Sequence, residues 1–105
     1  MRIAPGETWF VEFGLAKKPR WGIVIGAAED GRLALASVVA ITTRFDATPY
    51  EVALPRVPWL REQSYVNAQS IQPVKLSELA RKAPGKFDDK VFAQIKSAVK
   101  LWLRL

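Results

Sequence analysis

The sequence contains no histidine and no cysteine. Without histidine, acid–base chemistry lacks the one side chain whose ordinary pKa lies near neutrality, and a zinc site lacks its usual nitrogen ligands. Without cysteine, disulfides, thiolate nucleophiles and sulfur-bound metals are excluded together. The sequence therefore predicts neither a metal nor a cofactor, and the lack of cysteine suits a reducing compartment such as the cytosol.

Long apolar runs are missing as well. No run approaches the ~18 residues that span a bilayer, and the opening MRIAPGETW lacks the apolar stretch of a signal peptide. P-loop, dinucleotide-binding, EF-hand and HExxH motifs are also absent, which sets their functions aside. We therefore expect a soluble, cytoplasmic protein without a membrane partner.

Basic residues outnumber acidic ones by sixteen to ten, which gives a net charge of +6. Such a charge suits a polyanionic partner, either a nucleic acid or an acidic protein segment. Most of it lies in residues 75–105, which hold eight bases and three acids. Half of the 105 residues are apolar, and a chain of this length has room for one core, so we expect a single domain over residues 1–105.

Most of the chain has the short apolar runs and turn signals of strands. Runs bounded by glycine or proline predict strands over residues 7–13, 21–26, 32–41, 49–54 and 64–71, the last of them stopped by Pro73. The Asp30-Gly31 pair predicts a hairpin, so that the second and third strands are antiparallel neighbours.

Two helical segments are expected after the strands. Ser77 is suited to cap a short helical turn through Arg81, and Asp88 to cap a longer helix up to the C-terminus. The apolar residues of the longer helix recur at helical spacing, and Trp9 and Trp102 are expected in the core. Strands followed by helices indicate an α+β protein, with a twisted antiparallel sheet of five or six strands partly closed into a small barrel against the C-terminal helix.

The catalytic candidates are Arg20, which precedes the second strand, and Thr42, which follows the buried run of the third. If these strands form a hairpin, the start of one lies beside the end of the other, and the two residues are neighbours. A fixed guanidinium with a nearby hydroxyl can hold a phosphodiester and stabilise the extra charge of a pentacoordinate phosphorus. Further attraction for the phosphate would come from Lys17, Lys18 and Arg44.

Plainer interpretations of these residues stay open. In the plainer interpretation Arg20 is a solvated loop charge and Thr42 a common residue at a strand end, and residue types alone favour it. Trp21 is either a base-stacking or a packing residue. Asn67 and Gln69 share one strand face, where they either read base edges or simply face solvent.

The order of segments resembles the MazF/PemK family of toxin endoribonucleases over nearly the whole chain. The segments that carry the resemblance are GETWFVEF, KKPRWGIVI, VVAITTRFDATPYEV, SYVNAQSIQPVKLSEL and the C-terminal amphipathic helix. The resemblance implies a small SH3-like barrel with a C-terminal helix, usually a homodimer, for which Trp59 and Trp102 are the apolar anchors available.

The resemblance also implies an activity and a partner. Family members cut single-stranded RNA without a metal: the ribose 2′-OH attacks its own phosphate and leaves a 2′,3′-cyclic phosphate and a 5′-OH. Their antitoxins thread a disordered acidic tail over the site. The alternative is a non-catalytic relative on the same barrel, which only binds an antitoxin or poisons DNA gyrase as CcdB-like proteins do.

By position, the family's catalytic residues fall on Arg20 and Thr42. RNA contacts are expected from Lys17, Lys18, Trp21, Thr43, Arg44, Asp46, Asn67 and Gln69. Two departures from the family pattern stand out. The family usually has Arg-Pro where this chain has Arg20-Trp21, and some members have an acid on the later strand, where this chain has Asn67, Ala68 and Gln69. A general base from that strand is therefore missing, with Asp46 only a loose substitute, and Arg20 is better suited to stabilise charge than to donate a proton.

Overall fold

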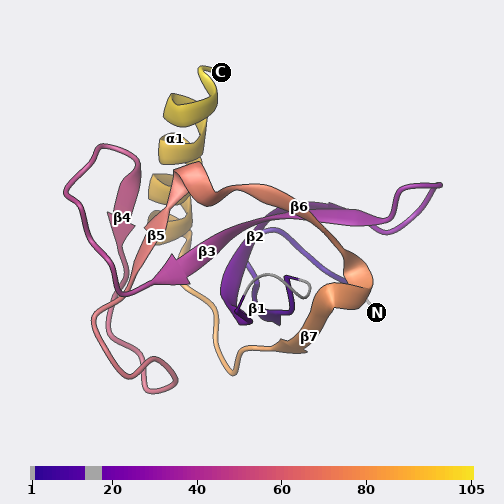
Figure 1. Cartoon of the computed structure of the whole chain (residues 1–105), viewed down its shortest axis with the longest axis horizontal. Coiled ribbons are helices and arrows are strands. Elements are labelled where there is room, and N and C mark those ends of the chain that lie inside the picture. Colours follow the sequence, from indigo (N-terminus) through magenta and orange to yellow (C-terminus); the bar gives the residue numbers. More distant parts are fainter. Residues whose placement is uncertain (1, 14–17) are drawn as a thin grey trace.

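The computed structural model describes residues 2–13 and 18–105. Strands dominate the first four fifths of the chain, and a helix ends it (Figure 1). The strands are β1 (Thr8–Val11), β2 (Arg20–Ala28), β3 (Leu35–Thr42), β4 (Glu51–Ala53), β5 (Tyr65–Asn67), β6 (Gln72–Lys75) and β7 (Leu79–Lys82). The helices are two 3₁₀ turns, η1 (Ala68–Ser70) and η2 (Leu76–Glu78), and α1 (Asp89–Leu103).

The described strands form one antiparallel sheet around β3. The hydrogen-bonded order is β4-β5-β3-β2-β1-β7. One edge of β3 is shared by two strands: its first half pairs with β6 and its second half with β5. The sheet curls so that β6 and β7 approach each other through η2, and it is not closed by a ladder between them (Figure 1). The α+β class is confirmed. The expected five or six strands are corrected to seven.

Two layers of core lie on the two faces of β2 and β3. Val24 pairs with Val38 inside the curl of the sheet, and Ile23 pairs with Val39 on the opposite face, against Ile95 of α1. All of these side chains are buried. β-branched residues fill both faces of a covered strand well, which explains why this unbroken apolar run forms a strand and not a helix.

β2 and β3 are antiparallel neighbours as the sequence predicts, but β3 begins at Leu35 and not at Arg32, because the ladder ends at the pair of Ala28 and Leu35. Gly31 has a φ of +83°, in the region that a residue with a side chain rarely adopts, and the turn projects from the body of the protein (Figure 1). Trp9 is also in the core as expected, at 6% exposed.

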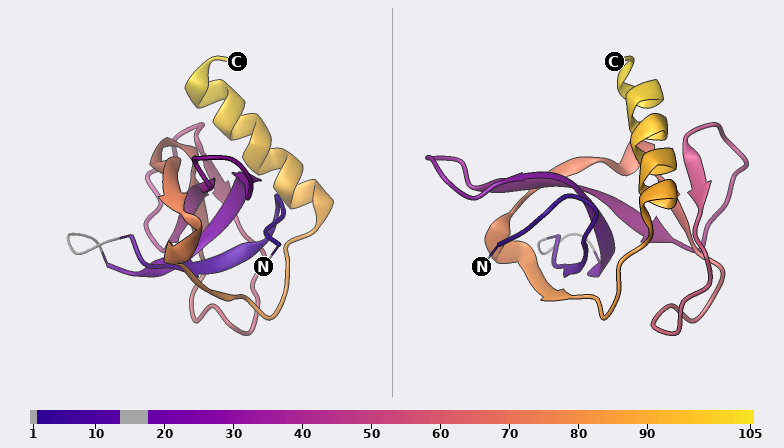
Figure 2. Two further views of the ribbon diagram at one scale, coloured as in Figure 1. Left: turned by 90° about the vertical axis from the view of Figure 1, so that its right-hand side faces the viewer. Right: turned by 180° about the vertical axis from the view of Figure 1, so that it is seen from behind.

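Helix α1 begins where the sequence indicates. The side chain of Asp88 accepts a hydrogen bond of 2.9 Å from the backbone N–H of Val91, and Arg104 ends the helix in a left-handed conformation. The last turn runs past the sheet (Figure 2), so Trp102 is 40% exposed. The expectation that Trp102 belongs to the core was wrong: its ring contacts that of Tyr50, with centroids 5.4 Å apart, but the rest of the side chain is left to the solvent.

The segment after β4 departs most from expectation. The strand expected over residues 64–71 ends at Asn67, whose side chain accepts a hydrogen bond of 2.9 Å from the N–H of Gln69 and so starts η1. Pro73 does not stop a strand but lies within β6, opposite Ser37. Proline is tolerated there because β6 leaves its other edge unpaired within the described sheet.

The helix expected from Ser77 to Arg81 is not formed. The side chain of Glu78 accepts a hydrogen bond of 2.7 Å from the N–H of Lys75, which stabilises only the single turn η2, and the chain then extends into β7 beside β1. Pairing with β1 outweighs the local signal for a helix. In the part of the chain described, no helix has the length and apolar content needed to cross a membrane.

Candidate active site

Arg20 and Thr42 lie beside each other at one end of the β2–β3 hairpin. The ladder pairs Gly22 with Ala40, so continuing it by two residues on each strand brings Arg20 next to Thr42 on the same face. Both residues line the same two hollows in the surface. The structure therefore brings the two catalytic candidates together as the hairpin predicts.

Arg20 is exposed and has no hydrogen-bond or ion-pair partner among residues 2–13 and 18–105. As far as those residues are concerned, its guanidinium retains all five N–H donors for a ligand. An exposed guanidinium without a carboxylate partner is a ready contact for an anion, and its planar fork matches the oxygens of a phosphate.

The two hollows differ in chemistry. The first, of about 270 Å³, extends past Trp21 and Phe10 to the polar residues Arg61 and Glu62. The second, of about 200 Å³, is lined mainly by residues of polar type, which besides Arg20 and Thr42 include Arg44, Asp46, Glu51 and Asn67.

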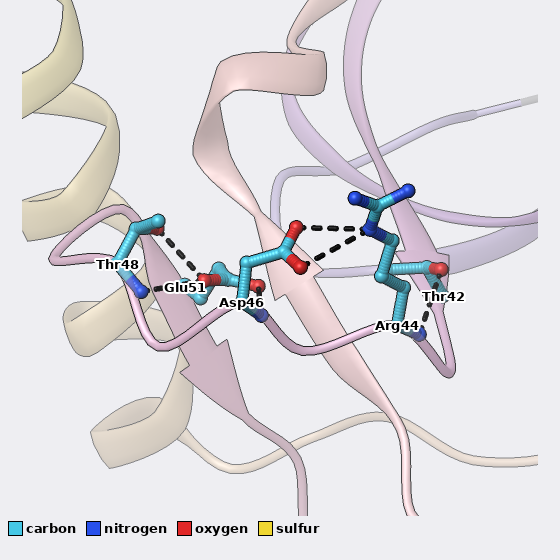
Figure 3. A network of polar contacts seen from close by, with 5 residues as sticks. All are labelled: Thr42, Arg44, Asp46, Thr48 and Glu51. Carbon is cyan, nitrogen blue, oxygen red and sulfur yellow. Dashed lines mark hydrogen bonds and ion pairs between the residues drawn. The ribbon is translucent and has the colours of Figure 1, made fainter.

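The loop between β3 and β4 is tied down by a network of polar contacts (Figure 3). The backbone N–H of Arg44 donates to Oγ1 of Thr42 at 3.1 Å, and Nε of Arg44 forms an ion pair with Oδ2 of Asp46 at 2.9 Å. Figure 3 shows the guanidinium of Arg44 turned toward the carboxylate of Asp46. Arg44 thus has a carboxylate partner, whereas Arg20 has none among the described residues.

Glu51 holds the other half of this loop. Its two carboxylate oxygens accept hydrogen bonds from the N–H of Asp46 at 2.9 Å, and from the N–H and the hydroxyl of Thr48 at 2.7 and 2.8 Å (Figure 3). The backbone bonds from Asp46 and Thr48 are the main reason that the pKa of Glu51 is lowered. Glu51 is therefore ionised at neutral pH and only weakly basic, which suits an anchor better than a proton acceptor.

The sequence prediction missed Glu51. Thr48 is followed three residues later by the acid Glu51. In this capping-box pattern the acidic side chain accepts hydrogen bonds from backbone N–H groups. This local signal was available in the sequence, although here it closes a loop before a strand and not the start of a helix.

The chain matches the family described as PemK-like, MazF-like toxin of type II toxin-antitoxin system over residues 4–103. It belongs to this family. The match spans nearly the whole chain and confirms the resemblance. No curated protein matches the chain.

Solved structures of MazF-like proteins share its fold. An endoribonuclease from Mycobacterial species in complex with its cognate antitoxin superposes with a TM-score of 0.82 at 22% identity, over 99% of this chain and 97% of that one. The Mycobacterium tuberculosis toxin MazF-mt6 gives 0.78 at 20% identity, over 94% and 97%. MazF from Deinococcus radiodurans gives 0.77 at 20% identity, over 96% of both chains.

The first departure from the MazF pattern, Trp21 after Arg20, has a structural explanation. The ring of Trp21 lies edge-on between Phe10, at 5.3 Å between centroids, and Trp59, at 5.2 Å. The guanidinium carbon of Arg81 lies 5.5 Å from its centroid. These contacts fix the strand end that carries Arg20, and they leave Trp21 half-buried, with part of it lining the first hollow.

Only some of the other expected RNA contacts of this MazF-like toxin line the two hollows. Asn67 lines the second hollow, and Thr43 lines the first. Gln69 and Lys18 are exposed but line neither of these two hollows. Lys17 lies outside the described residues. No group of three or more acidic side chains suited to hold a metal ion gathers within the described residues.

Proposed function

We propose that this MazF-like toxin is an endoribonuclease that cuts single-stranded RNA at a phosphate bound by Arg20 beside Thr42. The observation that carries the proposal is the exposed guanidinium of Arg20, which has no partner in the part of the chain that the structure describes, beside Thr42. Solved proteins of the same fold are described as endoribonucleases, which supports the assignment.

The chemistry needs little from the protein beyond charge. The ribose 2′-oxygen attacks the adjacent phosphorus, the bond from phosphorus to the 5′-oxygen breaks, and the products are a 2′,3′-cyclic phosphate and a 5′-OH. Arg20 stabilises the negative charge that builds on the non-bridging oxygens, and Thr42 donates its hydroxyl proton to one of them. The nucleophile comes from the substrate, as a chain without histidine or cysteine requires.

The proton of the 2′-OH leaves to solvent in this proposal. The two carboxylates that line the second hollow are both engaged, Asp46 with Arg44 and Glu51 with the loop backbone. The proton that the 5′-oxygen needs also comes from water, because Arg20 does not release a proton at neutral pH. The cleavage rate should therefore show no inflection near pH ~6.5, where a histidine would titrate.

A cleavage assay on a mixed RNA pool tests the proposal. The purified protein should produce discrete cuts whose upstream fragments end in cyclic phosphate, and a single 2′-deoxyribose at a mapped cut should abolish that cut. Intact RNA at micromolar protein would contradict the proposal and favour the alternative, a non-catalytic relative that binds an antitoxin or poisons DNA gyrase.

An antitoxin with a disordered acidic tail is the protein partner that we propose, in the cytoplasm. The toxin carries a net charge of +6, so long-range attraction should speed association with such a tail. Raising the salt should lower the on-rate, because the Debye length is only ~10 Å at 0.1 M. An on-rate that is the same at low and high salt would contradict an electrostatically guided partner.

We also propose a homodimer. Exposed apolar side chains gather at the C-terminal end of α1, and the adjoining face of the helix forms with β4 a groove of about 500 Å³. Of the two anchors suggested by the sequence, Trp102 is available for such an interface, whereas Trp59 is half-buried against Trp21 and Phe87. Sedimentation should show a dimer, and a species of only 11.8 kDa at tens of micromolar would contradict it.

A further inference from the structure

Phe45 is an exposed aromatic residue in the loop that follows Thr42. Its side chain is 51% exposed, although a phenylalanine gains most from burial. The other exposed large apolar residues of the described chain lie elsewhere, at the β2–β3 turn and at the end of α1. An exposed aromatic ring beside a candidate active site therefore requires an explanation.

The ring of Phe45 is stacked on that of Tyr65. Their centroids are 4.5 Å apart and the planes differ by 17°, so Tyr65 covers one face of Phe45 while about half of the side chain stays exposed. Tyr65 pairs directly with Thr42 in the ladder between β5 and β3, and paired residues project from the same face of a sheet. The stack thus lies in the same row of side chains as Thr42 and Arg20.

The loop holds this ring in place without a ligand. The residues on either side of Phe45 are both fixed, Arg44 through its N–H to Thr42 and Asp46 through its N–H to Glu51. A ring that is already ordered loses little conformational entropy when a second ring stacks on it. The ring is therefore ready to stack on a flat ligand, and the loop does not have to rearrange first.

We propose that Phe45, supported by Tyr65, is a stacking platform for a nucleobase next to the phosphate bound by Arg20 and Thr42. The proposal rests on the RNA-cleaving function proposed above and identifies the part of the RNA that this loop contacts. Every nucleobase has a flat π-face, so the platform adds affinity with little sequence preference. Base reading would then fall to polar groups such as Asn67 in the second hollow.

Binding of an uncleavable RNA tests the platform separately from cleavage. The probe is a labelled 12-nucleotide pool of randomised sequence with 2′-fluoro sugars, whose binding is followed by fluorescence anisotropy. Phe45→Ala should bind it about 5- to 150-fold more weakly, since one base stacked on an aromatic side chain is worth about that much. Phe45→Leu should recover little of the loss and Phe45→Trp most of it, because stacking needs the ring and not the apolar bulk.

Two controls isolate the bases. Leu33→Ala removes an exposed apolar side chain from the distant β2–β3 turn and should leave binding unchanged. A 12-unit abasic strand keeps the phosphates but has no bases, and its affinity should be equal for the wild type and Phe45→Ala. Thermal melting should show that every variant is folded, as the exposure of Phe45 leads us to expect.

The outcomes separate the two proposals. If the wild type binds the pool and Phe45→Ala binds it equally well, the platform is wrong, whether or not RNA is cut. If only binding of an acidic antitoxin segment falls in Phe45→Ala, the ring is a protein contact and the platform is likewise wrong. If the wild type binds but does not cut RNA, the proposed function fails, while a weaker Phe45→Ala still supports stacking.

Discussion

The backbone N–H of Arg44 donates a hydrogen bond of 3.1 Å to the side-chain oxygen of Thr42. This bond uses a lone pair of the hydroxyl and leaves its proton free, so Thr42 is directed to act as a donor. Donation is what a phosphate oxygen gaining charge requires, and Arg20 beside it supplies further donors of the same kind.

Arg20→Ala should lower the cleavage rate about 100- to 1000-fold, because it removes a fixed charge next to the reacting phosphate. Arg20→Lys should recover only part of the activity, since a point charge cannot bind two oxygens through a planar fork. Initial rates on the mixed RNA pool measure both effects. The free energy of unfolding should change by less than about 0.5 kcal/mol, because Arg20 is exposed.

Arg32→Ala is the matched control, since Arg32 is an exposed arginine at the far turn of the same hairpin. It should cut RNA at the parental rate. Equal losses in Arg20→Ala and Arg32→Ala would mean that total charge matters and that the site assignment is wrong.

Thr42→Val should also lower the cleavage rate about 100-fold or more, because valine keeps the shape of threonine but has no proton to donate. Thr42→Ser keeps the hydroxyl and should retain most of the activity. The same rate assay checks both variants. Full activity in Thr42→Val would remove this hydroxyl from the mechanism.

Glu51→Gln should slow cleavage about 10- to 100-fold, although Glu51 is not proposed to contact the phosphate. A small displacement of the loop would misplace the groups that act on the phosphate. Glutamine offers one acceptor oxygen where two are used, so the N–H of Asp46 or of Thr48 loses its partner. Faster hydrogen exchange at these two amides, followed by NMR, would show the loosened loop directly.

The exposed acid Glu12 provides the control for the Glu51 variant. Glu12→Gln should leave both the cleavage rate and the exchange of the loop amides unchanged. If Glu51→Gln slows cleavage while the loop amides stay protected, Glu51 acts on the reaction itself and not through the loop.

The central hairpin and the terminal helix could be predicted because their signals are local. The apolar run of β3, the Asp30-Gly31 turn and the Asp88 cap each fix a nearby stretch of backbone. That Arg20 and Thr42 lie close together then follows from an antiparallel hairpin, whereas their direct pairing also depends on the shift in register between Val24 and Gly26. The candidate site was predictable to that extent.

The remaining elements depend on partners that are distant in sequence. β7 forms because β1 offers an edge, and β6 because β3 does, although Pro73 and Ser77 argued locally against strands there. The stack of Phe45 on Tyr65 likewise requires β5 to pair with β3 in one particular register. The hydrophobic pattern of the Phe45 loop and that of β5 do not specify this register.

Thr8→Val should stabilise the protein by about 1–3 kcal/mol. Thr8 is 1% exposed, and its hydroxyl has no hydrogen-bond partner in the described structure. A buried, unpaired hydroxyl costs about that much, and valine fills the same volume without it. Thr48→Val is the opposite control, because the hydroxyl of Thr48 donates to Glu51, and it should destabilise. Urea unfolding measures both changes, and a destabilised Thr8→Val would indicate a partner for that hydroxyl.

Glu7 should make the stability of the fold depend on pH. Its side chain is 12% exposed, and its carboxylate accepts hydrogen bonds from the N–H of Ala4 and the indole of Trp9 while pairing with Lys82 at 2.7 Å. Burial alone would raise the pKa of Glu7, but the hydrogen bonds from Lys82, Ala4 and Trp9 together lower it below its ordinary value of 4.5.

Because the folded pKa lies below the unfolded one, the unfolded chain binds more protons between the two values. The contribution of Glu7 to stability is therefore complete above about pH 4.5 and is lost as the pH falls through the folded pKa. Glu7→Gln should remove this part of the pH dependence. At neutral pH the substitution should cost about 1 kcal/mol of stability or less, because Lys82 is half exposed and the glutamine oxygen can still accept from Trp9.

Urea unfolding of the wild type, Glu7→Gln and Glu12→Gln at pH 7, 5, 4 and 3 measures the difference. If the curves of wild type and Glu7→Gln stay parallel down to pH 3, the paired carboxylate of Glu7 does not contribute to acid sensitivity.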